Sequence, residues 1–275
     1  MKIRKKLLFA IMNHSLLLIF ASLVFVPLVW AFKSAFTPNG EIFTTNLFEL
    51  PSKLSFNNLI SGLTYAPFDK YFVNSLVVAL FVSVSIIITS TTAGYGFAKF
   101  NFRGRQILFS LVIAGMLLPF QAILIPLFIE IRFFGWIDQL QGIAVPGAVS
   151  AFGIFMMRQF IISIPNELIE ASMIDGCGSF GVFARIITPL AKGPISALGA
   201  LAFLASWNNY LWPLIVVQNE SRMTIPLGLS LFRGNNATAY GEVFAVSLVA
   251  AIPVAILFML MRRQIVSSFA TSGIK

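Results

Sequence analysis

Charged residues are scarce in this sequence of 275 residues. Only 11% are Asp, Glu, Lys or Arg and 58% are hydrophobic, whereas a water-soluble globular domain averages about 25% charged residues. Six apolar runs contain no charged residue: Ile11–Phe32, Phe72–Ala98, Ile107–Ile129, Leu140–Met157, Ile195–Val217 and Val243–Met261. Each run is close to the roughly 20 residues that a helix needs to cross a bilayer. We therefore predict an all-α integral membrane protein with six transmembrane helices.

The lack of ionisable groups in these runs argues against two classes of membrane protein. An ion-coupled transporter usually needs an ionisable residue at membrane depth, and the single histidine, His14, lies near the inner end of the first run. No cluster of His, Asp and Glu in the runs could hold a metal or activate water. The sequence also has no G-x-x-x-x-G-K-[ST] loop for ATP. We predict no enzymatic activity and no cofactor bound by this chain.

Cysteine is almost absent as well, because Cys177 is the only one and no intrachain disulfide can form. The first apolar run follows four basic residues, as a secretory signal would. It exceeds the apolar core of about 7–15 residues that is typical of such signals. We therefore interpret this run as the first membrane span.

The net charge of +9 is distributed unevenly along the chain. With the N-terminus inside, the cytoplasmic segments hold thirteen cations and three acids, and the outer segments hold six cations and seven acids. Cytoplasmic loops of membrane proteins carry an excess of Lys and Arg. The short basic clusters therefore indicate orientation in a lipid bilayer and not a nucleic-acid surface. We predict that both termini are cytoplasmic.

The longest predicted cytoplasmic loop covers residues 158–194 and contains a short helix pattern. Pro165 is tolerated in a first helical turn, and the charge of Glu167 in that turn suits the helix dipole. Gly176 and Gly178 offer a stop. A helix of about eleven residues is too short to span a bilayer. Two interpretations remain open from these residues alone: a helix lying on the membrane surface, or an element that docks on another protein.

The same loop carries a motif. It reads Glu170-Ala171-Ser172, then Asp175-Gly176, nine residues, Ile186 and Pro189. This pattern closely resembles the EAA motif of ABC importer permeases, E-A-A-x-x-x-G-x(9)-I-x-L-P, with Ser172 in place of the second Ala and Thr188 in place of Leu. The resemblance implies that the helix ending at Gly176 is a coupling helix, seated in a cleft of an ATPase subunit. The coupling residues it implies are Glu170, Ala171, Ser172, Asp175, Gly176 and Pro189.

The resemblance covers nearly the whole chain. Segments that are similar to carbohydrate-type permeases are Ala93–Arg105, Phe152–Phe160, Trp207–Leu214, Thr224–Leu229 and Gln264–Lys275. It implies the type I ABC importer permease architecture of the smaller maltose-type permease, as a single membrane domain over residues 1–275 in a bacterial or archaeal cytoplasmic (inner) membrane. The implied partners are a second permease in a heterodimer, two ATP-binding subunits that use ATP and Mg, and an extracytoplasmic solute-binding protein.

A polar and aromatic cluster lies in the predicted fifth span. It consists of Trp207, Asn208, Asn209 and Tyr210. Aromatic faces stack on sugar rings and amides bond to hydroxyls, so the cluster suits a path for a carbohydrate. Interfacial anchoring by Trp and interhelical bonding by Asn fit these residues equally well. The candidate contacts for the binding protein, in the outer segment from Gln218 to Glu242, are Arg222, Arg233, Asn235 and Asn236.

These observations together predict a function in transport. We expect the pore-forming transmembrane subunit of an ATP-driven, binding-protein-dependent importer that translocates a carbohydrate. The alternatives are a permease for a polyol, a glycerol phosphate compound or another small solute. From a different class, the chain could be a membrane scaffold that anchors an ATPase without translocating anything.

Overall fold

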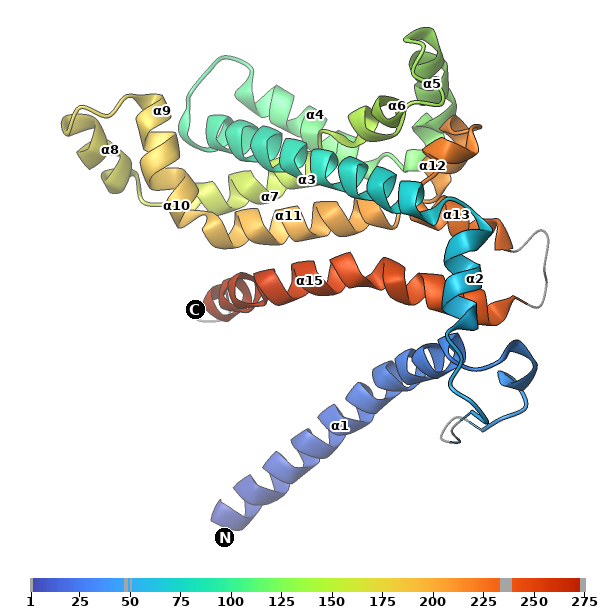
Figure 1. The fold of residues 1–275 in the computed structure, drawn as a ribbon. Helices are drawn as coiled ribbons and strands as arrows, with labels where there is room; N and C mark the ends of the chain where they lie inside the picture. Colours follow the sequence, from blue (N-terminus) through green and yellow to red (C-terminus); the bar gives the residue numbers. More distant parts are fainter. Residues whose placement is uncertain (1, 47–48, 50, 233–238, 273–275) are drawn as a thin grey trace. The chain divides into compact units, whose positions relative to one another are not determined.

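The computed structural model describes residues 2–46, 49, 51–232 and 239–272, which contain helices and no strand. The predicted all-α class is therefore confirmed for this part of the chain. The helices, drawn in Figure 1, are α1 Lys2–Ala35, η1 Asn39–Glu41, α2 Asn57–Tyr65, α3 Phe68–Lys99, α4 Arg105–Leu117, α5 Phe120–Phe133, α6 Leu140–Ala144, η2 Val145–Gly147, α7 Ala151–Ile162, α8 Asn166–Ile174, α9 Ser179–Val182, η3 Phe183–Ile187, α10 Thr188–Leu190, α11 Lys192–Trp207, α12 Leu211–Val216, η4 Glu220–Arg222, α13 Ile225–Ser230 and α15 Tyr240–Ser272.

Several helices are long and apolar enough to cross a membrane. Four qualify singly: Ile11–Ala35, Phe68–Lys99, Leu140–Ile162 and Tyr240–Met261. Two pairs qualify together but are bent, Arg105–Leu117 with Phe120–Phe133 by 102° and Ser179–Leu190 with Lys192–Trp207 by 78°. The described residues thus hold four candidate spans, or six if each bent pair is one span. The predicted count of six transmembrane helices agrees with the structure if each bent pair is one span.

The third apolar run is broken where the sequence analysis predicted one continuous helix. Helix α4 ends at Leu117, Leu118 is extended, and Pro119 precedes the first residue of α5. Proline has no backbone N–H and disfavours helical geometry at the residue before it. Pro119 therefore accounts for the break, which hydropathy alone did not reveal.

The fifth apolar run is also interrupted. Helix α11 starts at Lys192, earlier than predicted, and ends at Trp207, so Asn208–Tyr210 lies between α11 and α12 and not inside a span. The N–H of Asn208 donates to the carbonyls of Leu204 and Ser206, which tightens the last turn. The predicted polar and aromatic cluster, Trp207–Tyr210, therefore lies at the end of α11 and in the short connection to α12.

The chain divides into two compact units, Met1–Phe68 with Leu229–Ile252, and Asp69–Gly228 with Pro253–Lys275. In the first unit, the Asn58 amide donates to the carbonyls of Ala35 (3.2 Å) and Thr37 (2.7 Å). Asn39 donates to the Glu242 carboxylate at 2.9 Å. Hydrogen bonds from the side chain and backbone of Ser52 lower the pKa of the Glu41 carboxyl.

In the second unit, α3, α7 and α11 run side by side (Figure 1). Two glycines allow the close approach of these helices. A Cβ atom on Gly94 of α3 would lie 2.8 Å from the Cβ of Met157 in α7, and one on Gly199 of α11 would lie 2.8 Å from Ile87 Cδ1 in α3. The core of this unit includes the fully buried Val182, Ile187, Met157 and Ile161.

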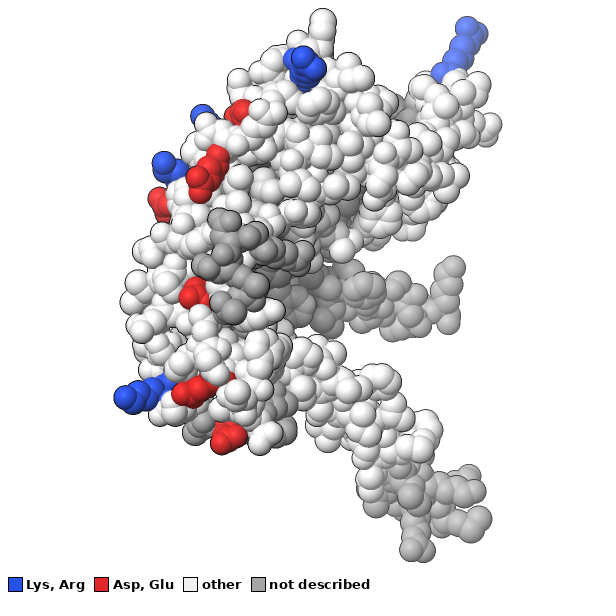
Figure 2. Space-filling model, turned by 90° about the vertical axis from the view of Figure 1, so that its right-hand side faces the viewer, with Lys and Arg blue, Asp and Glu red and all other residues white. Residues whose placement is uncertain are grey.

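The surface of the described residues is largely uncharged. On the face shown in Figure 2, acidic and basic side chains cover a small part of the area. Along α1, apolar side chains such as Leu17 and Leu18 are 66% and 68% exposed. Water would be a poor solvent for so much apolar surface. Lipid or another membrane subunit must cover it.

Candidate functional site

The short helix predicted in the loop after α7 is present as α8, Asn166–Ile174. Pro165 occupies the position before its first residue and Glu167 lies in its first turn. Lys99, the last residue of α3, holds the start of α8: its Nζ donates to the Ile164 carbonyl at 2.6 Å and to Asn166 Oδ1 at 2.8 Å. The short helix is therefore tied directly to a membrane-spanning helix.

Helix α8 has one buried side and a broad exposed side. Ile169 and Ser172 are buried, and the Ser172 hydroxyl donates to the Ile169 carbonyl at 2.7 Å. This bond satisfies the hydroxyl that replaces the second Ala of the motif. Besides Asn166, the exposed residues of the helix and its end are Glu167, Leu168, Glu170, Ala171, Met173, Ile174 and Asp175. They combine acidic groups with large apolar side chains, and Ile174 is 86% exposed.

The end of α8 is a Schellman motif. The N–H of Cys177 donates to the Ser172 carbonyl and the N–H of Gly176 to the Met173 carbonyl, both at 3.0 Å. Gly176 has a φ of +86°, in the left-handed region that favours glycine. The predicted stop at Gly176 is thus where the helix ends. A side chain at this position would strain the turn.

Pro189 of the motif lies farther along the chain, in α10, beyond a π-helical turn. Proline offers no N–H to the preceding turn, and the turn Phe183–Ile187 has π geometry. The backbone N–H of Thr188 and its hydroxyl both donate to the Phe183 carbonyl, the hydroxyl at 2.9 Å. The Thr that replaces the motif's Leu therefore bonds within this turn. Tyr95 of α3 connects to the same region by donating to the Ser179 carbonyl at 3.3 Å.

The four residues of the predicted solute path have different surroundings. Trp207 is only 3% exposed; its ring stacks on Phe203 at 5.5 Å and meets Phe72 edge-on at 5.7 Å. Asn208 and Tyr210 are exposed. Of the four, Asn209 lines a cavity.

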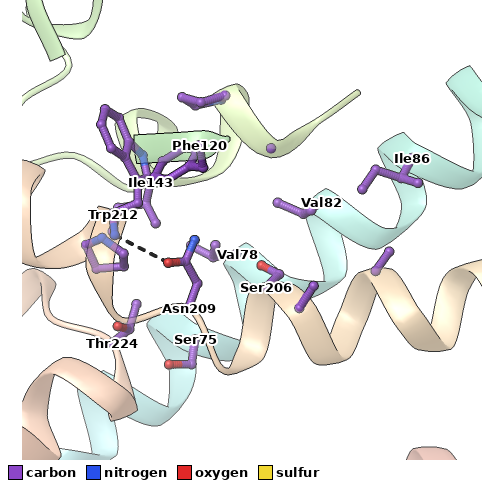
Figure 3. A pocket seen from close by; sticks show the side chains of 15 residues that line it. Ser75, Val78, Val82, Ile86, Phe120, Ile143, Ser206, Asn209, Trp212 and Thr224 are labelled. Atoms are coloured by element: carbon purple, nitrogen blue, oxygen red, sulfur yellow. Dashed lines mark hydrogen bonds between the residues drawn. The ribbon is translucent and has the colours of Figure 1, made fainter. Parts of the chain in front are cut away.

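This cavity lies in the second unit, between α3, α5, α6, η2, α11, α12 and the start of α13 (Figure 3). Its space is about 240 Å³. The polar residues of its lining are Ser75, Ser206, Asn209 and Thr224, and the larger apolar ones are Val78, Val82, Ile86, Phe120, Ile143, Trp212 and Pro213. Helix α3 alone supplies four of these residues, and its other end carries Lys99. One helix therefore lines the cavity and contacts α8.

The polar residues of the cavity were only partly found by sequence reasoning. Asn209 belongs to the polar and aromatic cluster that the sequence analysis singled out, whereas Ser75, Ser206 and Thr224 do not. Thr224 lies in Thr224–Leu229, a segment similar to carbohydrate-type permeases, and this similarity was the sequence feature that could have pointed to it. Ser83 and Thr89, also polar residues within a span, donate to carbonyls of their own helix, Ala79 at 2.5 Å and Ser85 at 2.7 Å. Neither lines the cavity.

The segment after α12, which the sequence analysis predicts to lie outside, is held by Asp138. Its Oδ1 accepts the backbone N–H groups of Gln218 (2.5 Å) and Asn219 (2.7 Å), and its own φ is +60°. Asn74 of α3 donates to the Ser221 and Met223 carbonyls at 3.0 and 2.9 Å. Among the predicted binding-protein contacts, Arg222 is exposed in η4. Arg233, Asn235 and Asn236 lie outside the described residues.

The described residues offer no group of three or more His, Cys, Asp or Glu side chains that could hold a metal ion.

The family model described as "Binding-protein-dependent transport system inner membrane component" matches residues 85–268. The chain belongs to this family. It is therefore a membrane subunit of a transport system that works with a binding protein, as the EAA motif predicted.

The relatives are permease proteins by name. The arabinooligosaccharides transport system permease protein AraQ of Bacillus subtilis is 35% identical over 243 residues, covering 86% of each chain. The diacetylchitobiose uptake system permease protein NgcG of Streptomyces coelicolor is 28% identical, over 94% of this chain and 87% of NgcG. The sn-glycerol-3-phosphate transport system permease protein UgpE of Pectobacterium atrosepticum is 30% identical, over 95% and 96%. All three matches span nearly the full chain.

A solved structure has the same fold. A chain of a bacterial ABC transporter involved in the import of the acidic polysaccharide alginate superposes with a TM-score of 0.81 at 24% identity, covering 93% of this chain and 96% of that chain. The predicted permease architecture is thereby confirmed. Because the family is one of transport permeases, the prediction that the chain is not an enzyme agrees with its membership.

Proposed function

We propose that this permease is one of two transmembrane subunits of an ATP-driven importer of a neutral carbohydrate, coupled through α8 to two ATP-binding subunits that use ATP and Mg. The observation that carries the proposal is the geometry of α8. It is a short helix with acidic and apolar side chains exposed together, and it is tied at its start to α3, which also lines the cavity. A solute-binding protein would deliver the carbohydrate from outside.

The exposed side of α8 is suited to a protein partner. A helix lying on an anionic membrane surface is typically rich in Lys and Arg on its polar face, whereas the polar face of α8 carries Glu167, Glu170 and Asp175 and no cation. Apolar side chains between acids fit a cleft with basic residues at its rim. Glu170 would then pair with a basic residue of the ATPase. Movement of that cleft would be passed to α3 through Lys99.

Lys99 should therefore matter for coupling. We expect Lys99→Met to lower solute-stimulated ATP hydrolysis about tenfold, because hydrogen bonds from a charged donor contribute about 1.5–3 kcal/mol. Association with the ATPase should persist, since the exposed side of α8 is unchanged. Lys70→Met, at the exposed start of α3, is the matched control and should have no effect. Equal activities of the two variants would remove Lys99 from the coupling route.

The proposed orientation places α8 and both termini in the cytoplasm. The support is the excess of cations in the segments on that side. It can be tested in a Cys177→Ser background with single cysteines at two exposed residues, Ser179 after α8 and Lys53 before α2. A membrane-impermeant maleimide should label Lys53→Cys in intact spheroplasts and Ser179→Cys only in inverted vesicles. The reverse pattern would overturn the orientation.

The solute class is inferred from the cavity and from the relatives together. The cavity lining has hydroxyl and amide groups, aromatic rings and no Lys, Arg or His. This composition favours a neutral hydroxylated solute over a phosphate ester, for which cationic groups would be expected. AraQ and NgcG are named for saccharides. UgpE, named for sn-glycerol 3-phosphate, supports a glycerol phosphate compound as the second candidate.

Transport by the full complex tests this proposal. The permease would be reconstituted in proteoliposomes with its partner permease, ATP-binding subunits and binding protein. Arabinotriose, diacetylchitobiose and sn-glycerol 3-phosphate would each be supplied with that binding protein. We expect ATP-dependent uptake of a saccharide and not of sn-glycerol 3-phosphate. Uptake of the phosphate ester alone would contradict the solute class, and an ATPase complex that takes up nothing would favour the scaffold alternative.

A further inference from the structure

We infer that the cavity lined by Ser75, Ser206, Asn209 and Thr224 is a binding subsite of this subunit for a single neutral sugar ring, with the Thr224 hydroxyl as a recognition group. The inference rests on the proposed function and goes further, because it assigns a solute contact to this permease and not to its partner alone. The chain itself leaves part of the hydrogen-bonding capacity of these polar groups unused.

Thr224 is the strongest single indication. Its residue is 4% exposed, and its hydroxyl is among the three buried side-chain oxygen atoms of the described residues that have no hydrogen-bond partner. The other two belong to Ser90 and Thr91, which do not line the cavity. Leaving a buried hydroxyl unpaired costs about 1–3 kcal/mol. Rotation of the Thr224 side chain toward the cavity that this residue lines would let a solute hydroxyl bond to it and remove this cost.

The neighbouring polar groups are held in place with capacity to spare. Ser75 Oγ accepts the N–H of Ile225 at 2.8 Å, so its own hydrogen can be donated. Asn209 Oδ1 accepts the N–H of Trp212 at 3.3 Å, shown dashed in Figure 3. No hydrogen bond of the Asn209 amide nitrogen is found within the described part of the chain. Each residue is thus oriented by the backbone and can still bond to a solute.

The remaining wall is rigid, apolar and partly aromatic. Trp212 is 2% exposed, its indole N–H donates to the Gly142 carbonyl at 2.9 Å, and Phe120 meets it edge-on with centroids 6.0 Å apart. Aliphatic residues Val78 and Val82 of α3 line another part of the cavity. Sugar rings present apolar C–H faces together with hydroxyl edges, and pockets that bind small molecules combine mostly apolar walls with a few placed polar groups.

The size of the cavity and the lack of charge in its lining narrow the class of ligand further. A space of about 240 Å³ is below the roughly 300–1,000 Å³ of pockets for drug-sized ligands, so one ring fits better than an oligosaccharide. The lining contains no ionisable side chain. An anionic or cationic solute would have to lose its hydration without a compensating charge. The chemistry selects a neutral ring, presented one at a time by a longer saccharide.

The test uses the purified complex of both permeases and the ATP-binding subunits, without binding protein, and measures equilibrium binding of radiolabelled arabinotriose and diacetylchitobiose. We expect Thr224→Val to weaken binding of the recognised sugar about three- to tenfold, as for one lost neutral hydrogen bond. Thr224→Ser should retain it. Thr91→Val is the matched control, because it removes a hydroxyl that is equally buried and unpaired but lies outside the cavity. Its binding should equal that of the wild type.

A second measurement does not depend on Thr224. In a Cys177→Ser background, Ser206→Cys should react with a small methanethiosulfonate reagent, and millimolar sugar should slow this reaction. If Thr224→Val binds like Thr91→Val, or if neither sugar protects Ser206→Cys in a complex whose wild type imports that sugar, the subsite is overturned. A wild-type complex that imports no saccharide would instead overturn the proposed function.

Discussion

A permease in which Glu170 and Asp175 are both replaced by lysine is expected to fold and insert normally but to lose its ATP-binding subunits. Both side chains are exposed on α8 or at its end, so their replacement removes no packing within the chain. At an interface with basic residues, each exchange turns an attraction into a repulsion. Like charges facing each other across an interface cost several kcal/mol. We expect a fall in affinity on the order of 100-fold or more.

Co-purification of the ATP-binding subunits with the tagged permease measures this effect directly. The matched control is Asp69→Lys with Glu130→Lys, two exposed acids outside the loop, which changes the net charge by the same amount. The control should retain the ATP-binding subunits. Neutral replacements, Glu170→Gln with Asp175→Asn, should give an intermediate loss. Normal assembly of the Glu170→Lys, Asp175→Lys permease would exclude α8 as the docking element.

The second large effect concerns folding. Replacing Gly94 by leucine should prevent the packing of α3 on α7, because a Cβ atom at Gly94 already lies 2.8 Å from Met157 Cβ and 2.9 Å from the backbone nitrogen of Arg158. Met157 is fully buried and the Arg158 contact is to the backbone, so neither neighbour can yield cheaply. Overpacking of this kind costs about 1–3 kcal/mol and more where backbone must move. We expect little monodisperse protein after detergent extraction.

Gly96, two residues later in the same helix, is the control. Nothing lies within 4 Å of a Cβ atom placed there, so Gly96→Leu should keep the thermal stability of the wild type or raise it, because glycine costs about 1 kcal/mol in a helix interior. Size-exclusion chromatography and thermal unfolding of both variants provide the comparison. Equal behaviour of the two leucine variants would contradict the close packing of α3 against α7.

The helices and their polar connections could be predicted from local sequence, because their causes are local. Uncharged runs predict spans, and α8 forms between Pro165 and Gly176 because a proline opens a helix well and a left-handed glycine closes it. The breaks within the third and fifth apolar runs were harder to predict. Pro119 interrupts a run that is apolar throughout, and a hydropathy average does not register the loss of one N–H group.

The cavity was beyond local reasoning. Ser75 and Thr224 are almost 150 residues apart in the sequence, and they meet because α3 packs beside the segment before α13, where Ser75 bonds to the N–H of Ile225. Trp207 was singled out from the sequence because its aromatic character favours a sugar contact. In the structure its ring is buried and packs on Phe203 and Phe72, which the local sequence did not indicate. Such outcomes depend on helix rotation and on tertiary partners.

In the proposed mechanism, a partner's ATP cycle acts on this permease through α8 and moves a solute. Its most direct test is the ATP hydrolysis of the reconstituted complex, measured with and without saccharide-loaded binding protein, for the wild type and for Lys99→Met. We expect strong stimulation in the wild type and about tenfold less in the variant, with the ATP-binding subunits still attached. Equal stimulation of both complexes, or none in the wild type, would contradict it.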